Sequence, residues 1–578
     1  MNVDPVVSEI VAGALRAIEE EVEDLLGRVW RSPSLRDAGD FSAALYDRFG
    51  RALTGRVLGA SPLPLLTACP LEDIRPGDVF LHNDPYLPPA GLGEAPDLRL
   101  TRPIFDGGRL IAFLQVRGRH DDLGGTHPGG APAGSSEIYH EGLLIPPVRI
   151  ARGEGTVADV RAILLRNSRR PDVLADDLGA QLGALRVGAL RLRDLVRRYG
   201  ADQLTACFAD LLRECELAFK RELLPNLPEG RWEAEAPLET DGFSGPHILR
   251  LALAREGESL IVDLNGTGPQ ARGPINCPLE GEGRAFLARL VSPLLMRLAE
   301  DPARLESISL NDGACRALEV RLPGPGTLVT PRFPAPTGLR ILTLGRLLSA
   351  FGEALFRATA GKTPASFDNL RVWSLGGWDT RGAFHLFREA PGAGTGASPL
   401  GDGGSAVPPI NGSGGLPVEL IEARYPLRVE SAGLVRDSGG AGARRGGLGV
   451  FREYRLLLEG NLSSGVSCSG AGPSGGCGGQ AGGPCRLTLS EGRKKAQTVP
   501  PVASSHPFSP GSLLRVETPG GGGWGDPKER DPEAVRLDVL RGYVSPEAAR
   551  DIFGAGLGKD PDFPHDPEQT RKLRAKKR

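Results

Sequence analysis

Ionisable side chains gather between Gly77 and Pro147, where short apolar runs alternate with turns rich in glycine and proline. Four of the eight histidines of the chain lie here: His82, His120, His127 and His140. The same stretch carries the carboxylates Asp84, Glu94, Asp97, Asp121, Asp122, Glu137 and Glu141. Strands hold side chains rigidly and turns present them to a ligand, so this pattern predicts a metal site or an acid–base site.

Composition indicates a globular protein and argues against two classes of partner. The 578 residues are 40% hydrophobic and 24% charged, and the net charge is −2. Such a length predicts roughly two to four domains. A net charge near zero gives no overall field that would favour nucleic acid or an anionic membrane. No apolar run is long enough to span a membrane.

The location that we expect is the cytoplasm. The first ten residues lack the basic start and apolar core of a signal peptide. The eight cysteines form no C-x-x-C pair, which is typical neither of a zinc ribbon nor of a disulfide scaffold. We therefore expect reduced thiols in a cytoplasmic protein.

Hydrophobic periodicity predicts a mixed α/β (α+β) fold. It has a β-rich N-terminal catalytic part, a helical middle and a Gly-rich β C-terminal part. We expect an N-terminal helix with a β-rich site region, a helical segment, an α/β middle region, a Gly-rich β region, and a C-terminal helix with a basic tail. These five segments are residues 1–155, 156–228, 229–365, 366–530 and 531–578.

Individual elements follow from caps, spacing and turns. A helix is expected over residues 4–30, with Asp4 as its cap and a proline in its first turn. Further helices are expected over residues 338–360 and 531–550, and a hairpin around Glu256. The Gly-rich loop over residues 391–415 is either an interdomain linker or a loop that lines a site.

The nucleotide-binding motifs are incomplete. Gly361, Lys362 and Thr363 end like a phosphate-binding loop, but Phe356 stands where that loop requires its first glycine. We therefore expect this chain to bind no ATP itself.

Several longer strings of the sequence carry a resemblance. They are HNDPY from His82, HDDLGG from His120, HEGLLIPP from His140, VDLNGTG from Val262, GPINCP from Gly273, RDSGGAGARRGGLGVFRE from Arg436 and TPGGGGWGDP from Thr518. In these strings the chain resembles the B subunit of the hydantoinase/oxoprolinase family, over roughly residues 5–550. The family includes the related metal-binding subunit of acetone carboxylase.

The resemblance implies a function. The chain would be the B subunit of an ATP-dependent cyclic amidase, which hydrolyses a lactam or hydantoin ring. An A-type subunit would bind ATP and phosphorylate the carbonyl oxygen, so a hetero-oligomer is expected. Two alternatives stay open: a non-catalytic structural or regulatory paralogue with a degenerate metal site, and an acetone-carboxylase-like subunit.

The chain departs from the family pattern within the predicted site. In LGEAPD, Glu94 stands where relatives commonly have histidine, whereas Asp97 is kept. In GRHDDLGG, Arg119 replaces the first histidine, whereas His120 and Asp122 are kept. An arginine cannot ligate a metal and carries a positive charge, so the exchange changes the chemistry that the site can perform.

Two interpretations of the site remain open. Leu66 stands for a further family histidine, and a family glutamate aligns with Asp37. In one interpretation the site binds manganese, magnesium or zinc through oxygen-rich ligands. These ligands are Asp37, Glu94, Asp97 and Asp122, with His120 as an additional ligand. In the other, Arg119 binds an anionic substrate or marks an impaired paralogue.

The resemblance and the residue types together predict the roles within the site. The predicted catalytic residues are Asp97, His120, Asp122 and Glu141. The predicted substrate-binding or anion-binding residues are Asp84, Arg119 and Arg445.

Overall fold

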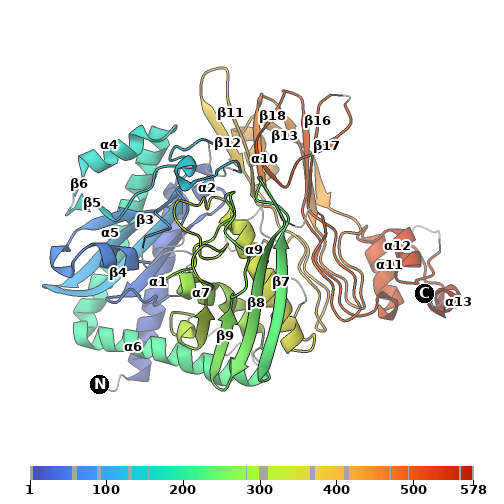
Figure 1. The fold of residues 1–578 in the computed structure, drawn as a ribbon, viewed down its shortest axis with the longest axis horizontal. Coiled ribbons are helices and arrows are strands. Elements are labelled where there is room, and N and C mark those ends of the chain that lie inside the picture. Colours follow the sequence, from blue (N-terminus) through green and yellow to red (C-terminus); the bar gives the residue numbers. More distant parts are fainter. Residues whose placement is uncertain are drawn as a thin grey trace. The chain divides into compact units, whose positions relative to one another are not determined.

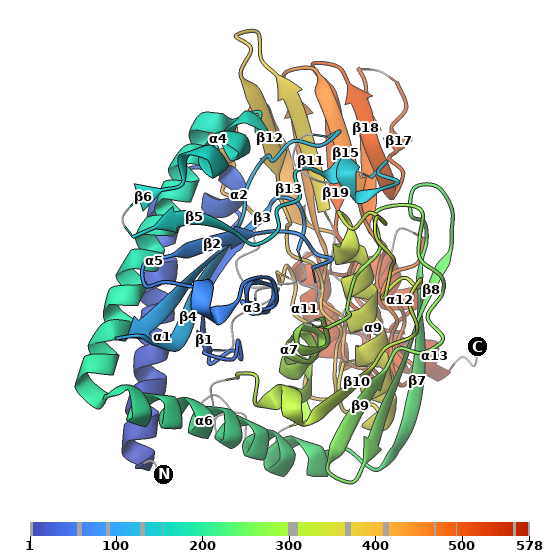
Figure 2. The same cartoon turned by 60° about the vertical axis from the view of Figure 1, so that its left-hand side comes forward.

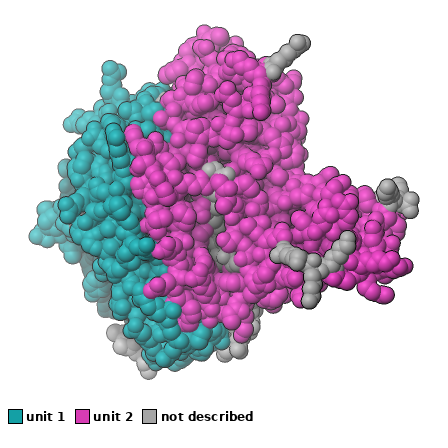
Figure 3. Space-filling model, turned by 45° about the vertical axis from the view of Figure 1, so that its right-hand side comes forward, with its two compact units in different colours: residues 1–231, 250–340 teal, residues 232–249, 341–578 magenta. Residues whose placement is uncertain are grey.

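The described chain forms two compact units, coloured separately in Figure 3. The computed structural model describes residues 4–54, 61–87, 93–127, 133–153, 155–281, 283–298, 310–364, 372–408, 415–467, 470–492, 494–558 and 562–575. The first unit comprises residues 1–231 and 250–340, and the second comprises residues 232–249 and 341–578. The five segments predicted from the sequence are stretches of secondary structure, and each unit combines several of them.

A six-stranded antiparallel sheet is the centre of the first unit (Figure 1). Its strand order is β1-β4-β3-β2-β5-β6. The strands are β1 (Phe41–Asp47), β2 (Val79–His82), β3 (Asp97–Asp106), β4 (Arg109–Arg119), β5 (Val148–Arg152) and β6 (Gly155–Thr156). The predicted β-rich N-terminal part is thus confirmed.

Two long helices, α1 (Pro5–Val29) and α5 (Pro171–Tyr199), cover one face of this sheet (Figure 2). The Asp4 side chain accepts from Val6 N–H and caps α1, as predicted. Apolar residues of both helices form one core with alternate residues of the strands, and Leu185 of α5 is fully buried in it. The remaining helices of this unit are α2 (Pro33–Arg36), α3 (Leu63–Ala68), α4 (Ala158–Arg166), α6 (Ala201–Ala218) and α7 (Gly283–Leu295).

The opposite face of the sheet carries buried polar side chains. They can be identified along each strand, because successive residues of a strand point to opposite faces. On β3, Leu98 and Leu100 belong to the helix-side core, so Asp97 and Arg99 point the other way. On β4, Val116 likewise joins the core. The polar residues on the far face are Asp97, Arg99 and Thr101 of β3 and Gln115, Arg117 and Arg119 of β4. A sheet face this polar and this buried is a candidate site.

A four-stranded sheet of order β10-β9-β8-β7 follows in the chain. Its strands are β7 (Gly230–Leu238), β8 (His247–Glu256), β9 (Ser259–Asp263) and β10 (Leu318–Arg321). Strands β8 and β9 pair antiparallel up to Glu256 and Ser259, which confirms the predicted hairpin. Helix α9 (Arg340–Ala358) confirms the helix predicted over residues 338–360.

The second unit contains two antiparallel sheets, of order β12-β11-β15-β18 and β13-β14-β19-β16-β17. The first contains β11 (Val372–Trp378), β12 (Phe384–Arg388), β15 (Gly460–Gly465) and β18 (Val502–Phe508). The second contains β13 (Leu427–Leu434), β14 (Val450–Leu456), β16 (Arg486–Ser490), β17 (Gln497–Thr498) and β19 (Leu513–Glu517). Trp373, Phe387 and Tyr454 pack in their shared core. A short helix, α10 (Val418–Arg424), precedes β13.

The described part of the Gly-rich loop is packed within the second unit, so its interpretation as an interdomain linker is wrong. Gly447 N–H donates to Thr395 O (2.9 Å), and Gly394 N–H donates to Pro519 O (3.0 Å). A Cβ added to Gly521 would lie 1.9 Å from Thr395 O, so backbone packs directly against backbone here. Residues 409–414 of the loop lie outside the described residues.

The C-terminal region differs from the single helix predicted over residues 531–550. Two helices form there instead, α11 (Pro532–Leu540) and α12 (Pro546–Asp551). Ser545 caps the second helix by accepting from Ala548 N–H, which explains the interruption. A further helix, α13 (Pro567–Ala575), includes part of the predicted basic tail.

Short 3-10 and π turns complete the described secondary structure: Leu71–Asp73, Ile138–Glu141, Phe219–Leu223, Leu224–Asn226, Met296–Leu298, Ala314–Arg316 and Pro527–Glu529. Among the described helices, none combines the length and the apolar character needed to cross a bilayer.

Candidate functional site

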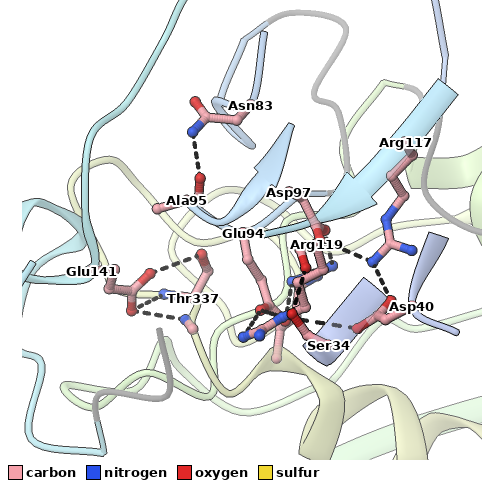
Figure 4. A network of polar contacts seen from close by, with 12 residues as sticks. Ser34, Asp40, Asn83, Glu94, Ala95, Asp97, Arg117, Arg119, Glu141 and Thr337 are labelled. Carbon is pink, nitrogen blue, oxygen red and sulfur yellow. Dashed lines mark hydrogen bonds and ion pairs between the residues drawn. The ribbon is translucent and has the colours of Figure 1, made fainter. Parts of the chain in front are cut away.

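Glu94 lies between two guanidinium groups on the polar face of the six-stranded sheet (Figure 4). Arg119 Nε and Nη2 lie 3.0 and 2.9 Å from Glu94 Oε2. Arg340 Nη1, from the first residue of α9, lies 2.6 Å from Glu94 Oε1. All three side chains are at most 10% exposed. The exchange of a family histidine for Glu94 thus coincides with two arginines that pair with its carboxylate.

Asp97 is the second carboxylate of this cluster and is almost fully buried. Arg117 Nη2 lies 2.9 Å from Asp97 Oδ1, and Arg340 Nη2 lies 3.4 Å from Asp97 Oδ2. Burial alone would raise the pKa of Asp97, but Arg117, Arg340, Arg99 and Arg119 together hold this pKa well below its usual range. Asp97 is therefore ionised at every pH at which the protein would work.

Asp40 lies at the outer, partly exposed edge of the cluster (Figure 4). Its Oδ1 lies 2.9 Å from Arg117 Nη2, the atom that also pairs with Asp97. The Asp40 side chain is 33% exposed and that of Arg117 is 15% exposed, compared with 1% for Asp97. The cluster therefore reaches water at Asp40 and Arg117.

His82 lies across from Arg99, because these two residues are direct partners in the pairing of β2 with β3. The imidazole is buried, and its Nδ1 has no hydrogen-bond partner within the described residues. Burial and the neighbouring Arg99 guanidinium lower the pKa of His82 to about 3, so the ring is neutral near pH 7. Gly93 leaves room for Arg99, since an added Cβ would lie 2.5 Å from Arg99 Nη1.

Glu141 approaches the cluster from the 3-10 helix Ile138–Glu141 (Figure 4). Thr337 N–H and Gly338 N–H donate to its Oε1 (2.8 and 2.7 Å), and Thr337 Oγ1 lies 3.3 Å from its Oε2. These donors immediately precede α9, so Glu141 is anchored at the start of the helix that supplies Arg340. Burial and the nearby Glu94 carboxylate raise the pKa of Glu141 to about 8 despite these hydrogen bonds.

His120 and Asp122 lie outside the cluster and hold local structure. His120 Nε2 lies 3.1 Å from Gln181 Oε1 of α5, and its ring packs edge-on against Trp30. Burial lowers the pKa of His120. Asp122 accepts from Arg169 Nη1 (2.9 Å) and from Gly124 N–H, which orders the loop after β4.

The remaining predicted residues are also placed apart from the cluster. Asp37 pairs with the neighbouring Arg36 (2.8 Å), and Asp84 accepts from Tyr86 N–H (2.8 Å). Arg445 belongs to the second unit, where its Nε lies 3.3 Å from Asp538 Oδ2. Of the predicted site residues, the structure brings together Glu94, Asp97 and Arg119, with Glu141 beside them.

The predicted metal ligands do not form a coordination set. Within the described residues, no group of three or more histidine, cysteine or acidic side chains is arranged to hold a metal ion. Glu94 and Asp97 each face at least two guanidinium groups, and a divalent cation between them would meet these positive charges at close range. The described residues of this cluster therefore do not fit a divalent metal.

Four residues of the cluster were not predicted from the sequence: Asp40, Arg99, Arg117 and Arg340. A signal for two of them exists in the strand pattern. Arg99 follows Asp97 by two residues and Arg117 precedes Arg119 by two, which places each pair on one face of its strand. Arg340 had no such signal, because it is 243 residues from Asp97 in the chain.

The fold and the cluster together define an α+β protein with a buried ion-pair site. The site lies on one face of an antiparallel sheet, opposite the face that α1 and α5 cover. The chain belongs to the hydantoinase B/oxoprolinase family, whose model matches residues 4–527.

Relatives and solved structures match along nearly the whole chain. A protein described as the putative B subunit of a D-/L-hydantoinase, from Pseudomonas sp. (strain NS671), is 28% identical, with 99% of this chain and 98% of the relative covered. The beta subunit of caprolactamase from Pseudomonas jessenii is 30% identical, with 96% of each covered. The crystal structure of ATP-dependent caprolactamase from Pseudomonas jessenii matches with a TM-score of 0.87 at 27% identity over the full length of both chains.

Proposed function

We propose that this chain is the B subunit of an ATP-dependent cyclic amidase, which opens a lactam or hydantoin ring together with an A-type subunit. Support comes from the family and from relatives that are named as the B subunit of a hydantoinase and the beta subunit of a caprolactamase. The partner would bind ATP and activate the ring carbonyl, because the chain itself lacks a complete phosphate-binding loop. The expected assembly is a hetero-oligomer, and the cytoplasmic location stays a prediction.

The proposed chemistry at this site is hydrolysis of an activated amide. Water adds to the carbon that carries the phosphorylated oxygen, and the carbon–nitrogen bond breaks as the ring nitrogen takes a proton. A second water then releases the phosphoryl group as phosphate, which leaves a carboxylate. The phosphoryl group and the carboxylate that forms carry negative charge, and the guanidinium groups of Arg119 and Arg340 are positive charges that would stabilise it. They lie in a buried site, where such stabilisation is stronger than in water.

The observation that carries this proposal is the environment of Glu141. A carboxylic acid whose pKa is about 8 still carries its proton near pH 7. We propose that Glu141 gives this proton to the leaving ring nitrogen, and that the proton lost by the attacking water restores the acid. Asp97 would hold the guanidinium groups in place, whereas His120 and Asp122 would position the sheet and the loop beside them.

The test compares Glu141→Gln with the unchanged chain in complex with an A-type subunit, ATP and a cyclic amide. Glutamine keeps an acceptor for the two N–H groups at Oε1 but has no proton to give. We expect ring opening to fall at least about 100-fold, as for loss of a general acid. The matched control is Glu137→Gln, which changes a 45% exposed carboxylate four residues away and should leave the rate unchanged.

The outcomes also separate the alternatives. A complex that forms but opens no ring with either the unchanged chain or the variant would indicate a non-catalytic paralogue. Carboxylation of a ketone with bicarbonate, in place of ring opening, would indicate an acetone-carboxylase-like protein. An unchanged rate in Glu141→Gln would remove Glu141 from the mechanism.

A further inference from the structure

The cluster on the six-stranded sheet contains more positive than negative charge. Its guanidinium groups are those of Arg99, Arg117, Arg119 and Arg340. Its carboxylates are those of Asp40, Glu94 and Asp97. Glu141 adds no charge near pH 7, because its pKa is raised to about 8. Within the described part of the chain, four positive charges therefore face three negative ones.

A second ion-pair network in the same chain, buried except at Asp402, has equal numbers of positive and negative charges. In the second unit, Arg530 lies 2.7 Å from both oxygens of Asp402 and 2.8 Å from Asp538. Arg445 also pairs with Asp538. Two guanidinium groups thus meet two carboxylates, as expected of a network that only holds the fold together.

An unbalanced buried charge is unfavourable unless an additional ion compensates for it. Burial lowers the pKa of Arg99 to about 10, but the guanidinium remains protonated at neutral pH. The excess in the sheet cluster is therefore a fixed positive charge, and an anion is the ligand that would remove it. A divalent cation would instead increase the imbalance.

A ligand would enter the cluster at its partly exposed edge, which Asp40 and Arg117 form. Arg117 Nη2 is shared between the buried Asp97 and the 33% exposed Asp40. Rotation of the Asp40 side chain toward solvent would break its ion pairs with Arg117 and Arg119. This loss is smaller than for a buried carboxylate, because the Asp40 side chain is already partly hydrated. An incoming anion that displaced Asp40 would meet Arg117 first and would find two excess positive charges.

A further polar atom on the same face, Nδ1 of His82, has no hydrogen-bond partner among the described residues. His82 is buried, it is the cross-strand neighbour of Arg99, and its Nδ1 makes no hydrogen bond within the described residues. A buried nitrogen without a partner is unfavourable in a native structure. A ligand oxygen beside Arg99 would supply the missing partner.

We propose that Arg99, Arg117, Arg119 and Arg340, with His82, form a binding site for an oxyanion, and that Asp40 is its exchangeable internal counter-ion. Planar guanidinium groups match the geometry of carboxylate and phosphoryl oxygens. The source of the oxyanion rests on the proposed function: it is either the phosphoryl group of the activated substrate or the carboxylate that ring opening creates.

The test is isothermal titration of the isolated full chain with inorganic phosphate, with acetate and with manganese chloride, at constant ionic strength. We expect saturable binding of at least one anion at about one per chain, and no stoichiometric binding of manganese. Tighter binding of phosphate would identify the phosphoryl group as the source, and tighter binding of acetate the carboxylate. Failure of both anions to bind, or one tightly held manganese ion per chain, would overturn the proposal.

Two substitutions give opposite expected changes. Asp40→Asn removes the competing carboxylate and should tighten anion binding about tenfold, or about 1.4 kcal/mol. Arg117→Gln removes the first guanidinium that the anion meets and should weaken binding by a similar factor. A general loss of structure cannot tighten binding, so an unchanged or weaker affinity of Asp40→Asn would contradict the role of Asp40.

The matched control is Arg289→Gln. The Arg289 side chain is 8% exposed, lies in the same unit and has a carboxylate partner of its own, because it pairs with both oxygens of Asp312 (2.6 and 2.7 Å). It should leave anion binding unchanged. Because these titrations need neither the A-type partner nor turnover, they can fail while ring opening succeeds, and they can succeed where ring opening fails.

Discussion

Glu141 should make the stability of this protein fall as the pH rises, and Glu141→Gln should abolish that dependence. The carboxyl group of glutamate has a pKa of about 4.5 when exposed, whereas the pKa of Glu141 is raised to about 8 in the folded chain. Between these values the folded state holds a proton that the unfolded state has released. The free energy of unfolding therefore decreases as the pH rises through this range, and it levels off above pH 8.

The expected size of the effect follows from the two pKa values. One unit of difference corresponds to about 1.4 kcal/mol, so a difference of 8 − 4.5 = 3.5 units corresponds to about 5 kcal/mol over the full range. Between pH 5.5 and 8.5 the loss from this one group should be about 3 kcal/mol. The whole pKa difference contributes to the free energy of unfolding, because the Glu141 residue is only 3% exposed and water screens its charge little.

The assay is urea unfolding of the unchanged chain and of Glu141→Gln at pH 5.5, 7.0 and 8.5. Other titrating groups are common to both proteins, so the difference between the two unfolding free energies isolates Glu141. The variant should gain relative stability steadily from pH 5.5 to 8.5. The matched control Glu137→Gln changes a 45% exposed carboxylate of the same segment and should not reproduce the gain of about 3 kcal/mol expected for Glu141→Gln. A constant difference for Glu141→Gln would refute the raised pKa.

Three further predictions concern packing within the two units, each taken by itself. Leu185→Ala, in the core between α5 and the six-stranded sheet, should lower the free energy of unfolding by about 2–5 kcal/mol in urea denaturation. Gly521→Ala should destabilise the second unit by about 3 kcal/mol or more, measured by hydrogen exchange, because the new Cβ would lie 1.9 Å from Thr395 O. Arg530→Gln should cost about 3–5 kcal/mol by the same method, because Asp538 would lose its closest charge partner.

Much of the fold could be predicted from the sequence, because caps and periodicity are local signals. Asp4 and the proline that follows it located the start of α1, and the residues around Glu256 located a hairpin. The Gly-rich loop after Pro391 was harder, because glycine is equally typical of a flexible linker and of backbone packed against backbone. Only contacts between distant segments, such as Gly447 N–H with Thr395 O, distinguish the two.

The candidate site could be predicted only in part. Resemblance located Glu94, Asp97 and Arg119, and the structure brings these three together. It also predicted His120 as a ligand, whereas the side chain turns toward Gln181 of α5. The fourth guanidinium group, that of Arg340, comes from a helix whose start is fixed by tertiary contacts with Glu141. No local pattern near Arg340 could have indicated this.

The measurement that tests the central claim most directly is ring opening by the purified chain mixed with an A-type partner. The two proteins, separately and together, would be incubated with ATP and with hydantoin, 5-oxoproline or caprolactam, and the ring-opened product and ADP would be quantified. We predict product from at least one ring only when both proteins and ATP are present, with ADP formed in step with product. ATP consumption without ring opening of any of these compounds, or ring opening that does not need this chain, would contradict the account.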